Sequence, residues 1–500
     1  MPRPLSPSAA FWIAPLVHLE HHWAAQQAEC LVNSVQGQIL RGTSMITKLS
    51  LCCGPLLLSL CLYSGAWSQL PAASPNSPPD HRYKADILLV VAHPDDDSLA
   101  APYLAKAIYE EHKHVSVIYG TRGDAGGNAV GNEQAASLGA VREIEGRRAL
   151  ASMGILDVWF LDAPDTPGQD VLHSLETWGH GASLEKVVRL VRLTRPEVIL
   201  TWLPVYVAGE NHDDHQAAGV LATEAFDLAG DPVAFPEQLA APRDRTSIGN
   251  YGEGLRPWQA KKIYYFSDAT HFEFLEGRGP QYKTSDVSPS KGVSYATIAT
   301  NAWMSDKSQL PPNQTDLKKY LDQYLSEPVR FVLGKSLVNG STTGDIFEGI
   351  VPGSIAYVRA HGYEPAVREN LSIELGGPWA YYREFWRAHK LEHLSQLLSP
   401  ETALGGPENT VWVPLLIHND TDAARQVTLQ AVLPPGWTEK PGPMIYTVGA
   451  HDAYPVQVNL VADSSQKSSW QKITWTADAD GHSIGSLTLR VHVNYNGVPQ

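Results

Sequence analysis

The chain has 500 residues, which is too many for one ordinary hydrophobic core, so we expect at least two folded domains. Hydrophobic residues make up 43% and charged residues 18% of the chain, which is typical of a soluble globular protein and excludes a disordered or membrane-embedded one. The formal net charge of -15 argues against nucleic acid as a partner, because phosphate binding needs clustered Lys and Arg side chains.

The N-terminal residues are expected to lie outside the folded domains. Lys48, followed by LSLCCGPLLLSLCLY, predicts a signal peptide over residues 45–68. We expect residues 1–44 to be an extension from a mis-annotated upstream start, and residues 69–84 to be a linker rich in Pro and Ser. The protein is therefore predicted to be secreted, to the periplasm or the medium, and an uncleaved membrane anchor is the alternative.

All cysteines precede the predicted cleavage point, at Cys30, Cys52, Cys53 and Cys61. The mature protein would then hold neither disulfides nor thiolate ligands. Any metal site must be built from His, Asp and Glu.

Hydrophobic runs alternate with helical patterns over residues 85–310. We expect helices at 98–112 and 136–154, and buried strands at 86–91, 115–120, 157–162, 197–204 and 261–267. This order predicts an α/β fold with a Rossmann-like, mainly parallel sheet and helices on both faces. In such sheets ligands bind at the carboxyl ends of the strands.

The pattern of hydrophobic and turn residues changes twice after residue 310. Residues 311–404 are rich in loops with short helical pieces, and we expect them to extend the preceding domain. Residues 405–500 contain hydrophobic runs separated by turn residues at short spacing, which predicts an all-β, immunoglobulin-like sandwich.

Polar clusters follow the first and the fourth expected strands. The first contains His93 and Asp95–Asp97, and the second contains His212 and His215. Aspartates packed at a strand end repel one another and are costly to desolvate, which points to a divalent cation. His93, Asp96 and His215 supply two imidazoles and one carboxylate, a set that suits Zn²⁺ with an open position for water, with other divalent transition metals as alternatives.

The neighbouring polar residues suggest a reaction. Asp95 is suited to act as a general base on metal-activated water, and His212 to stabilise an oxyanion or protonate a leaving amine. Asp214 is expected to hold His212 in position. The alternative for the first cluster is a helix N-cap with acidic residues in the first turn, but capping explains neither His93 nor the second cluster.

A glycine-rich run, GTRGDAGGNAVGN, follows the second expected strand. Its spacing differs from the dinucleotide fingerprint, so we interpret it as an active-site loop and expect no nucleotide.

The motifs AHPDDD, GTRGDAGG, LGAVREIEGRRALASMG and HDDH occur in this order, each near a strand end or on a helix. Together they resemble the PIG-L/LmbE-like N-acetylglucosaminyl deacetylases over residues 85–310. Two positions depart from that pattern: Asp97 replaces the usual Glu, and Asp213 the usual Pro. Residues 405–500 resemble the NEW3-type modules associated with glycosidases, which implies attachment to a cell-surface glycan.

The resemblance to this family implies the same metal and catalytic residues as the side-chain chemistry does. The motif residues would serve as metal ligands (His93, Asp96, His215), general base (Asp95) and polarising group (His212). It adds Arg142 as a residue that contacts substrate hydroxyls.

These expectations combine into a secreted, zinc-dependent hydrolase that deacetylates an N-acetylated amino sugar or glycoconjugate. One alternative is an amidase acting on another sugar-linked amide, such as a thiol-sugar conjugate. Another is a carbohydrate-binding surface protein with a vestigial metal site.

Overall fold

The computed structural model describes residues 81–205, 212–240, 254–268, 275–359, 370–404, 410–463 and 469–493. The predicted signal peptide and most of the predicted linker lie outside these residues. Among the helices that are described, none is both long and apolar enough to cross a lipid bilayer.

A six-stranded sheet forms the centre of the α/β region, with strand order β3-β2-β1-β4-β5-β8. Its strands are β1 (Ile87–Val91), β2 (Val115–Tyr119), β3 (Val158–Phe160), β4 (Val198–Trp202), β5 (Lys262–Phe266) and β8 (Val332–Ser336). All neighbours are parallel except β8, which runs antiparallel to β5. Strands β1, β2, β4 and β5 are buried along their whole length, as expected when apolar runs are covered on both faces. The predicted parallel α/β sheet is confirmed.

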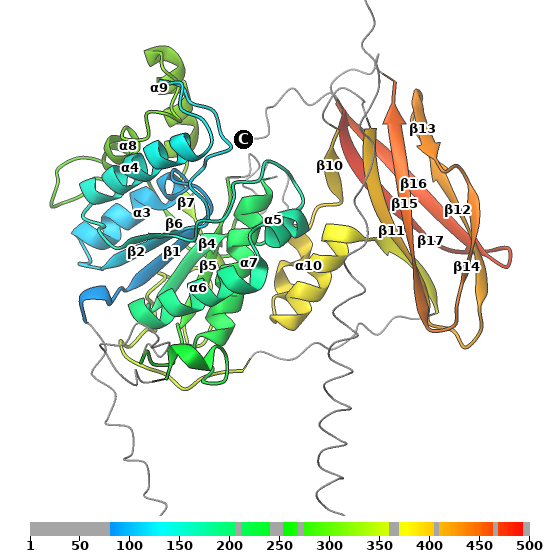
Figure 1. Ribbon diagram of the computed structural model, residues 1–500, viewed down its shortest axis with the longest axis horizontal. Coiled ribbons are helices and arrows are strands. Elements are labelled where there is room, and N and C mark those ends of the chain that lie inside the picture. The colour runs from blue at the N-terminus through cyan, green and yellow to red at the C-terminus, as the bar shows by residue number, and fades with distance from the viewer. Residues whose placement is uncertain are drawn as a thin grey trace, which may run out of the picture. The chain divides into compact units, whose positions relative to one another are not determined.

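The helices form two groups. One group contains α3 (Asp97–Tyr109), α4 (Ala136–Ser152), α8 (Tyr295–Trp303) and α9 (Gln314–Leu325), and the other contains α5 (Val171–Thr177), α6 (His180–Thr194), α7 (Asp213–Leu228) and α10 (Gly377–Ala388). Right-handed crossovers place α3 and α4 on one face of the sheet and α6 and α7 on the other, because the chain reverses direction across the sheet after β3. Figure 1 shows the sheet between these groups. Short 3₁₀ helices occupy His81–Tyr83, Pro236–Gln238 and Glu392–Leu397.

The reversal of strand order defines where a ligand would bind. Strand β1 has β2 on one side and β4 on the other, so the connections after β1 and β4 leave toward opposite faces. In sheets of this kind ligands bind at the carboxyl ends of two such strands. Both polar clusters of the sequence follow these ends.

The C-terminal region contains two further sheets. One has the order β10-β17-β16-β12-β14 and the other β13-β15-β11-β9. Both contribute to one hydrophobic cluster, separate from that of the α/β region. The strands are β9 (Leu371–Leu375), β10 (Glu401–Ala403), β11 (Thr410–Asn419), β12 (Arg425–Val432), β13 (Trp437–Lys440), β14 (Met444–Val448), β15 (Asp452–Ala462), β16 (Ser469–Ala479) and β17 (His482–Val493).

The segment 311–404 contributes to both regions. It supplies α9, β8 and α10 to the α/β region, together with β7 (Val329–Arg330), which pairs with β6 (Gln281–Tyr282). It also supplies β9 and β10, which pair with β11 and β17. The C-terminal sheets therefore include two strands that precede residue 405, the expected start of the C-terminal domain. The immunoglobulin-like topology stays a prediction.

Candidate active site

The segments that follow β1 and β4 bring three predicted metal ligands together. Oδ1 of Asp96 lies 3.2 Å from Nε2 of His215 and 3.5 Å from Nδ1 of His93. All three side chains are buried, and their candidate ligand atoms lie within 4.8 Å of one another. The group could therefore hold a metal ion.

The surroundings of Asp96 fit a cation. Its Oδ2 accepts hydrogen bonds from the backbone N of Ala92 at 2.8 Å and of His93 at 2.9 Å, and from Nε1 of Trp202 at 2.7 Å. These three donors orient the carboxylate so that Oδ1 faces the two imidazoles. Burial would raise the pKa of Asp96, but the imidazoles of His215 and His93 hold it well below its usual range. Asp96 thus presents a charged oxygen, as a metal ligand must.

Trp202 at the end of β4 was not predicted from the sequence. Besides its hydrogen bond to Asp96, its ring stacks on that of His215, with centroids 3.9 Å apart and planes 4° apart. Partners of this kind orient ligand side chains and set their affinity for the metal. The only sequence signal was an aromatic residue at the end of an apolar strand, which is more often part of the core.

Carboxylates also face the other side of the His93 ring. Nε2 of His93 lies 3.3 Å from Oδ1 of Asp165 and 3.5 Å from Oδ2 of Asp214. Burial would lower the pKa of His93, yet Asp96, Asp165 and Asp214 raise it well above its usual value. The negative charge around this imidazole favours a bound cation. Asp165, in the loop after β3, was also missed.

A second possible metal group consists of His93, His212 and Asp214. Both carboxylate oxygens of Asp214 already accept hydrogen bonds from Thr166, one from its backbone N at 2.9 Å and the other from Oγ1. Oδ1 of Asp96 has no such competing donor among the hydrogen bonds of the described residues. Of the two groups, His93, Asp96 and His215 are therefore the better candidates to hold a metal ion.

The structure places both Asp213 and Asp214 beside His212, and Asp214 contacts its ring through the backbone rather than the carboxylate. The carboxylate of Asp214 faces Thr166 and His93, and only its backbone N contacts the His212 ring, at 3.3 Å from Nδ1. It is Oδ1 of Asp213 that lies 3.3 Å from this Nδ1. His212 is the N-cap of α7, and successive side chains in the first turn point about 100° apart, so the carboxylates of Asp213 and Asp214 face different neighbours.

Asp95 and Asp97 flank Asp96 but differ in environment. Asp95 is half-buried, and burial together with the charge of Asp96 raises its pKa to about 6. Asp97 is buried and accepts a 2.6 Å hydrogen bond from Oη of Tyr119, while burial raises its pKa to about 7. Asp97, at the position of the usual Glu, therefore bonds away from the metal group.

Arg142 supports the glycine-rich loop. Its Nη1 donates to the carbonyl of Gly123 at 2.6 Å and its Nη2 to that of Gly127 at 2.8 Å. A Cβ at Gly126 would lie only 2.5 Å from Nη2, so the loop closes directly on the guanidinium. The glycines allow this close approach. The predicted contact of Arg142 with substrate hydroxyls stays a prediction.

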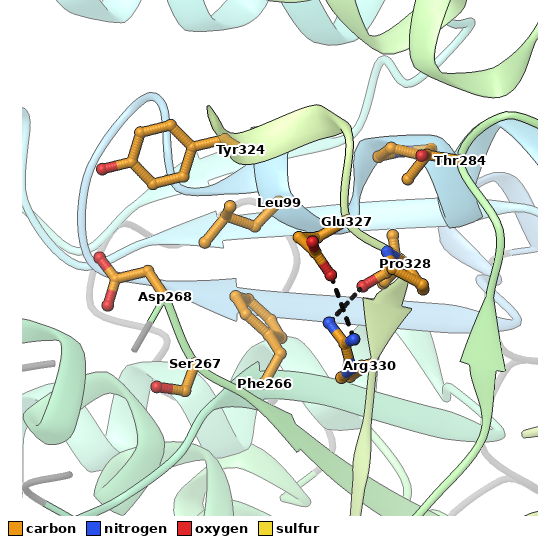
Figure 2. Close-up of a pocket in the computed structure, with 11 residues that line it drawn as sticks. Leu99, Phe266, Ser267, Asp268, Thr284, Tyr324, Glu327, Pro328 and Arg330 are labelled. Atoms are coloured by element: carbon orange, nitrogen blue, oxygen red, sulfur yellow. Dashed lines mark hydrogen bonds and ion pairs between the residues drawn. The ribbon is translucent and has the colours of Figure 1, made fainter. Parts of the chain in front are cut away.

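A small cavity lies beside the carboxyl end of β5 (Figure 2). Phe266, Ser267 and Asp268 line it together with Leu99 of α3, and its volume is about 40 Å³. The Phe266 ring is 4.7 Å from that of Trp202, so the cavity lies next to the metal group. It has room for a few water molecules, whereas ligand pockets measure roughly 300–1,000 Å³, so we do not assign the substrate to it.

The comparisons with known proteins concern this same region. Residues 88–226 match the family described as PIG-L: GlcNAc-PI de-N-acetylase, a span that supplies every residue of the metal group. The resemblance of the motifs to PIG-L proteins is thereby confirmed for these residues. The NEW3-type resemblance of the C-terminal region stays a prediction.

Two curated relatives and one solved structure are similar to parts of the chain. A 1D-myo-inositol 2-acetamido-2-deoxy-alpha-D-glucopyranoside deacetylase 1 of Catenulispora acidiphila is 27% identical over 211 residues, which are 39% of this chain and 58% of the relative. A deacetylase of the same description from Geodermatophilus obscurus is 30% identical over 194 residues, 36% of this chain and 60% of the relative. The chain thus spans less than two thirds of these relatives. The N,N'-diacetylchitobiose deacetylase of Pyrococcus horikoshii aligns with a TM-score of 0.37 at 17% identity, over 50% of this chain and 84% of that one.

Proposed function

We propose that the protein is a zinc-dependent hydrolase that removes the acetyl group from an N-acetylated amino sugar or its glycoconjugate. The observation that carries this proposal is the convergence of His93, Asp96 and His215, next to the half-buried carboxyl of Asp95. The match of residues 88–226 to the PIG-L family, and the relatives named as deacetylases of an acetamido sugar, support the reaction type.

His93, Asp96 and His215 would hold the zinc ion, which when bound polarises an amide carbonyl and makes a nearby water more acidic. Asp95 would take the proton of the attacking water and pass it to the leaving amine. Before a cation binds, burial and the charge of Asp96 raise its pKa to about 6, so the group is ionised at neutral pH and able to accept a proton from water.

His212 would stabilise the charge that develops on the carbonyl oxygen. Burial lowers its pKa, and the neighbouring His93 lowers it further, so we expect a neutral ring. Its Nδ1 lies 3.3 Å from the backbone N of Asp214 and 3.3 Å from Oδ1 of Asp213, and these two contacts hold the ring in place. Arg142 would serve the substrate by holding the loop at Gly123 and Gly127.

Acetate release from a panel of N-acetylated sugars, measured with zinc-loaded and zinc-depleted protein, tests the proposal. We expect release only with zinc bound, and thermal stabilisation on adding zinc, because a ligand of the folded state raises its stability by mass action. Full turnover by zinc-depleted protein would refute the metal's role. Release of a different acyl group or of a peptide would refute the substrate class.

The proposal extends to location. We expect export through the signal at residues 45–68, which N-terminal sequencing of protein from the periplasm or medium would test; a start other than Gln69 would move the cleavage point. The C-terminal sheets would attach the enzyme to a cell-surface glycan. To test this, the binding of the full chain to purified cell walls is compared with that of a chain ending before residue 410.

A further inference from the structure

Helix α10 is anchored to α7 at two points. Oη of Tyr382 bonds to Oε1 of Gln216 near the start of α7, and Nδ1 of His389 lies 2.6 Å from Oδ2 of Asp227 near its end. Tyr382 and Gln216 are each only 1% exposed, so water cannot replace their contact. Helix α10, which lies outside the span matched to the PIG-L family, therefore reaches the residue next to the metal ligand His215.

The donor and acceptor in each hydrogen bond of the Gln216 amide follow from the groups that it contacts. Nε2 of Gln216 lies 3.2 Å from the carbonyl oxygen of His212, which can only accept. The other end of the amide, Oε1, also only accepts, so the Tyr382 hydroxyl must donate to it. Tyr382 thereby holds the Gln216 amide in the one orientation that bonds to His212.

His212 is held at both its carbonyl and its ring. The carbonyl oxygen accepts from the side chain of Gln216 at 3.2 Å and from its backbone N at 3.4 Å. The ring Nδ1 accepts from the backbone N of Asp214 at 3.3 Å. A change in the Gln216 amide would therefore shift the N-cap residue that carries the ring.

We propose that Tyr382 is a positioning residue, which acts through Gln216 to hold the His212 ring where the deacetylation requires it. The inference rests on the proposed function for its kinetic consequences. It assigns a role to the segment 377–388, which the motifs of the α/β region do not include.

Tyr382→Phe removes the hydroxyl and keeps the buried ring. Because His212 would act on charge that develops only in the transition state, we expect kcat to fall about tenfold with KM unchanged, the loss that corresponds to one modest hydrogen bond. Tyr381→Phe is the matched control, since its Oη is buried without a hydrogen-bond partner among the described residues. This control should keep the wild-type kcat.

A double-mutant cycle separates positioning from a structural effect. In a His212→Ala background, Tyr382→Phe should cause no further loss of kcat if it acts through His212. An equal tenfold loss in both backgrounds would overturn the proposal, as would an unchanged kcat in folded Tyr382→Phe protein.

A second measurement does not depend on turnover. In zinc-loaded protein with labelled histidine, the ring nitrogen resonances of His212, assigned by their loss in His212→Ala, should shift in Tyr382→Phe and stay in place in Tyr381→Phe. Unmoved resonances would overturn the proposal. A shift without acetate release from any sugar would uphold the positioning role and refute the proposed function instead.

Discussion

Nε1 of Trp202 donates a 2.7 Å hydrogen bond to Oδ2 of Asp96, the carboxylate whose other oxygen faces both imidazoles of the metal group. The same ring stacks on His215. One buried side chain at the end of β4 thus orients two of the proposed ligands.

Trp202→Phe should weaken zinc binding. Phe keeps an aromatic ring against His215 but removes the donor to Asp96, so Oδ2 of the carboxylate loses one of its three donors. We expect the zinc affinity to fall about 10- to 100-fold, the usual effect of losing a partner that orients a ligand. Competition with a chromophoric chelator measures this.

Trp303→Phe serves as the control for that substitution. Nε1 of Trp303 is buried and has no hydrogen-bond partner among the described residues, so its loss removes packing but no donor to the site. Its zinc affinity should equal that of the wild type. An unchanged affinity in Trp202→Phe would mean that the backbone donors of Ala92 and His93 suffice to orient Asp96.

Asp95→Asn and His93→Ala should separate proton transfer from metal binding. Asp95→Asn removes the proposed base without removing a proposed ligand, so kcat should fall about 10²- to 10⁴-fold with zinc content unchanged. His93→Ala should lose the zinc itself. Metal analysis and initial rates on the same preparations check both, and wild-type turnover in Asp95→Asn would exclude Asp95 as the base.

Gly126→Ala should disturb the loop held by Arg142. Its Cβ would lie 2.5 Å from Nη2, which would displace the guanidinium from the carbonyls of Gly123 and Gly127. We expect a raised KM with zinc content unchanged. Gly127→Ala is the comparison, because its Cβ would meet nothing within 4 Å, and a similar KM in the two variants would contradict the packing argument.

The pair of His180 and Glu224 should make stability depend on pH. Nε2 of His180 lies 2.6 Å from Oε2 of Glu224, and this hydrogen bond raises the pKa of His180 above its usual 6.5, with burial opposing it. Since the folded-state pKa is the higher one, the pair's contribution is complete below the unfolded-state pKa and is lost as pH rises through the folded-state value.

His180→Gln should therefore lower the free energy of unfolding more at about pH 5.5 than at about pH 9, a difference that urea denaturation at the two values measures. In a Glu224→Gln background this pH dependence should disappear. If the free energies of unfolding of wild type and His180→Gln differed by the same amount at both pH values, the pair would make no pH-dependent contribution to stability.

Much of the site could be predicted from local patterns. Runs such as ILLVV and VILTW are apolar enough to be buried on both faces, which identifies β1 and β4 as strands of a parallel sheet. His93 and Asp96 follow the first run closely, and His215 follows the second. Because parallel strands end at one edge, these residues could be expected to meet.

The partners of these residues could not be predicted in the same way. Trp202, Asp165 and Tyr382 have unremarkable positions in the sequence, and each gains its role from a neighbour more than 70 residues away. Asp213 and Asp214 are identical residues, and only the path of the first turn of α7 decides which one faces His212.

The amino-acid sequence alone thus determined the main strands of the parallel sheet and the residues of the candidate metal group, because hydrophobic periodicity and side-chain chemistry are local properties. Tertiary structure decided the strand order that brings β1 beside β4, the addition of β9 and β10 to the C-terminal sheets, and the hydrogen bonds that orient the ligands. These depend on which distant segments pack together, and that is set by the burial of whole surfaces and the pairing of buried polar groups, which no short stretch of sequence contains.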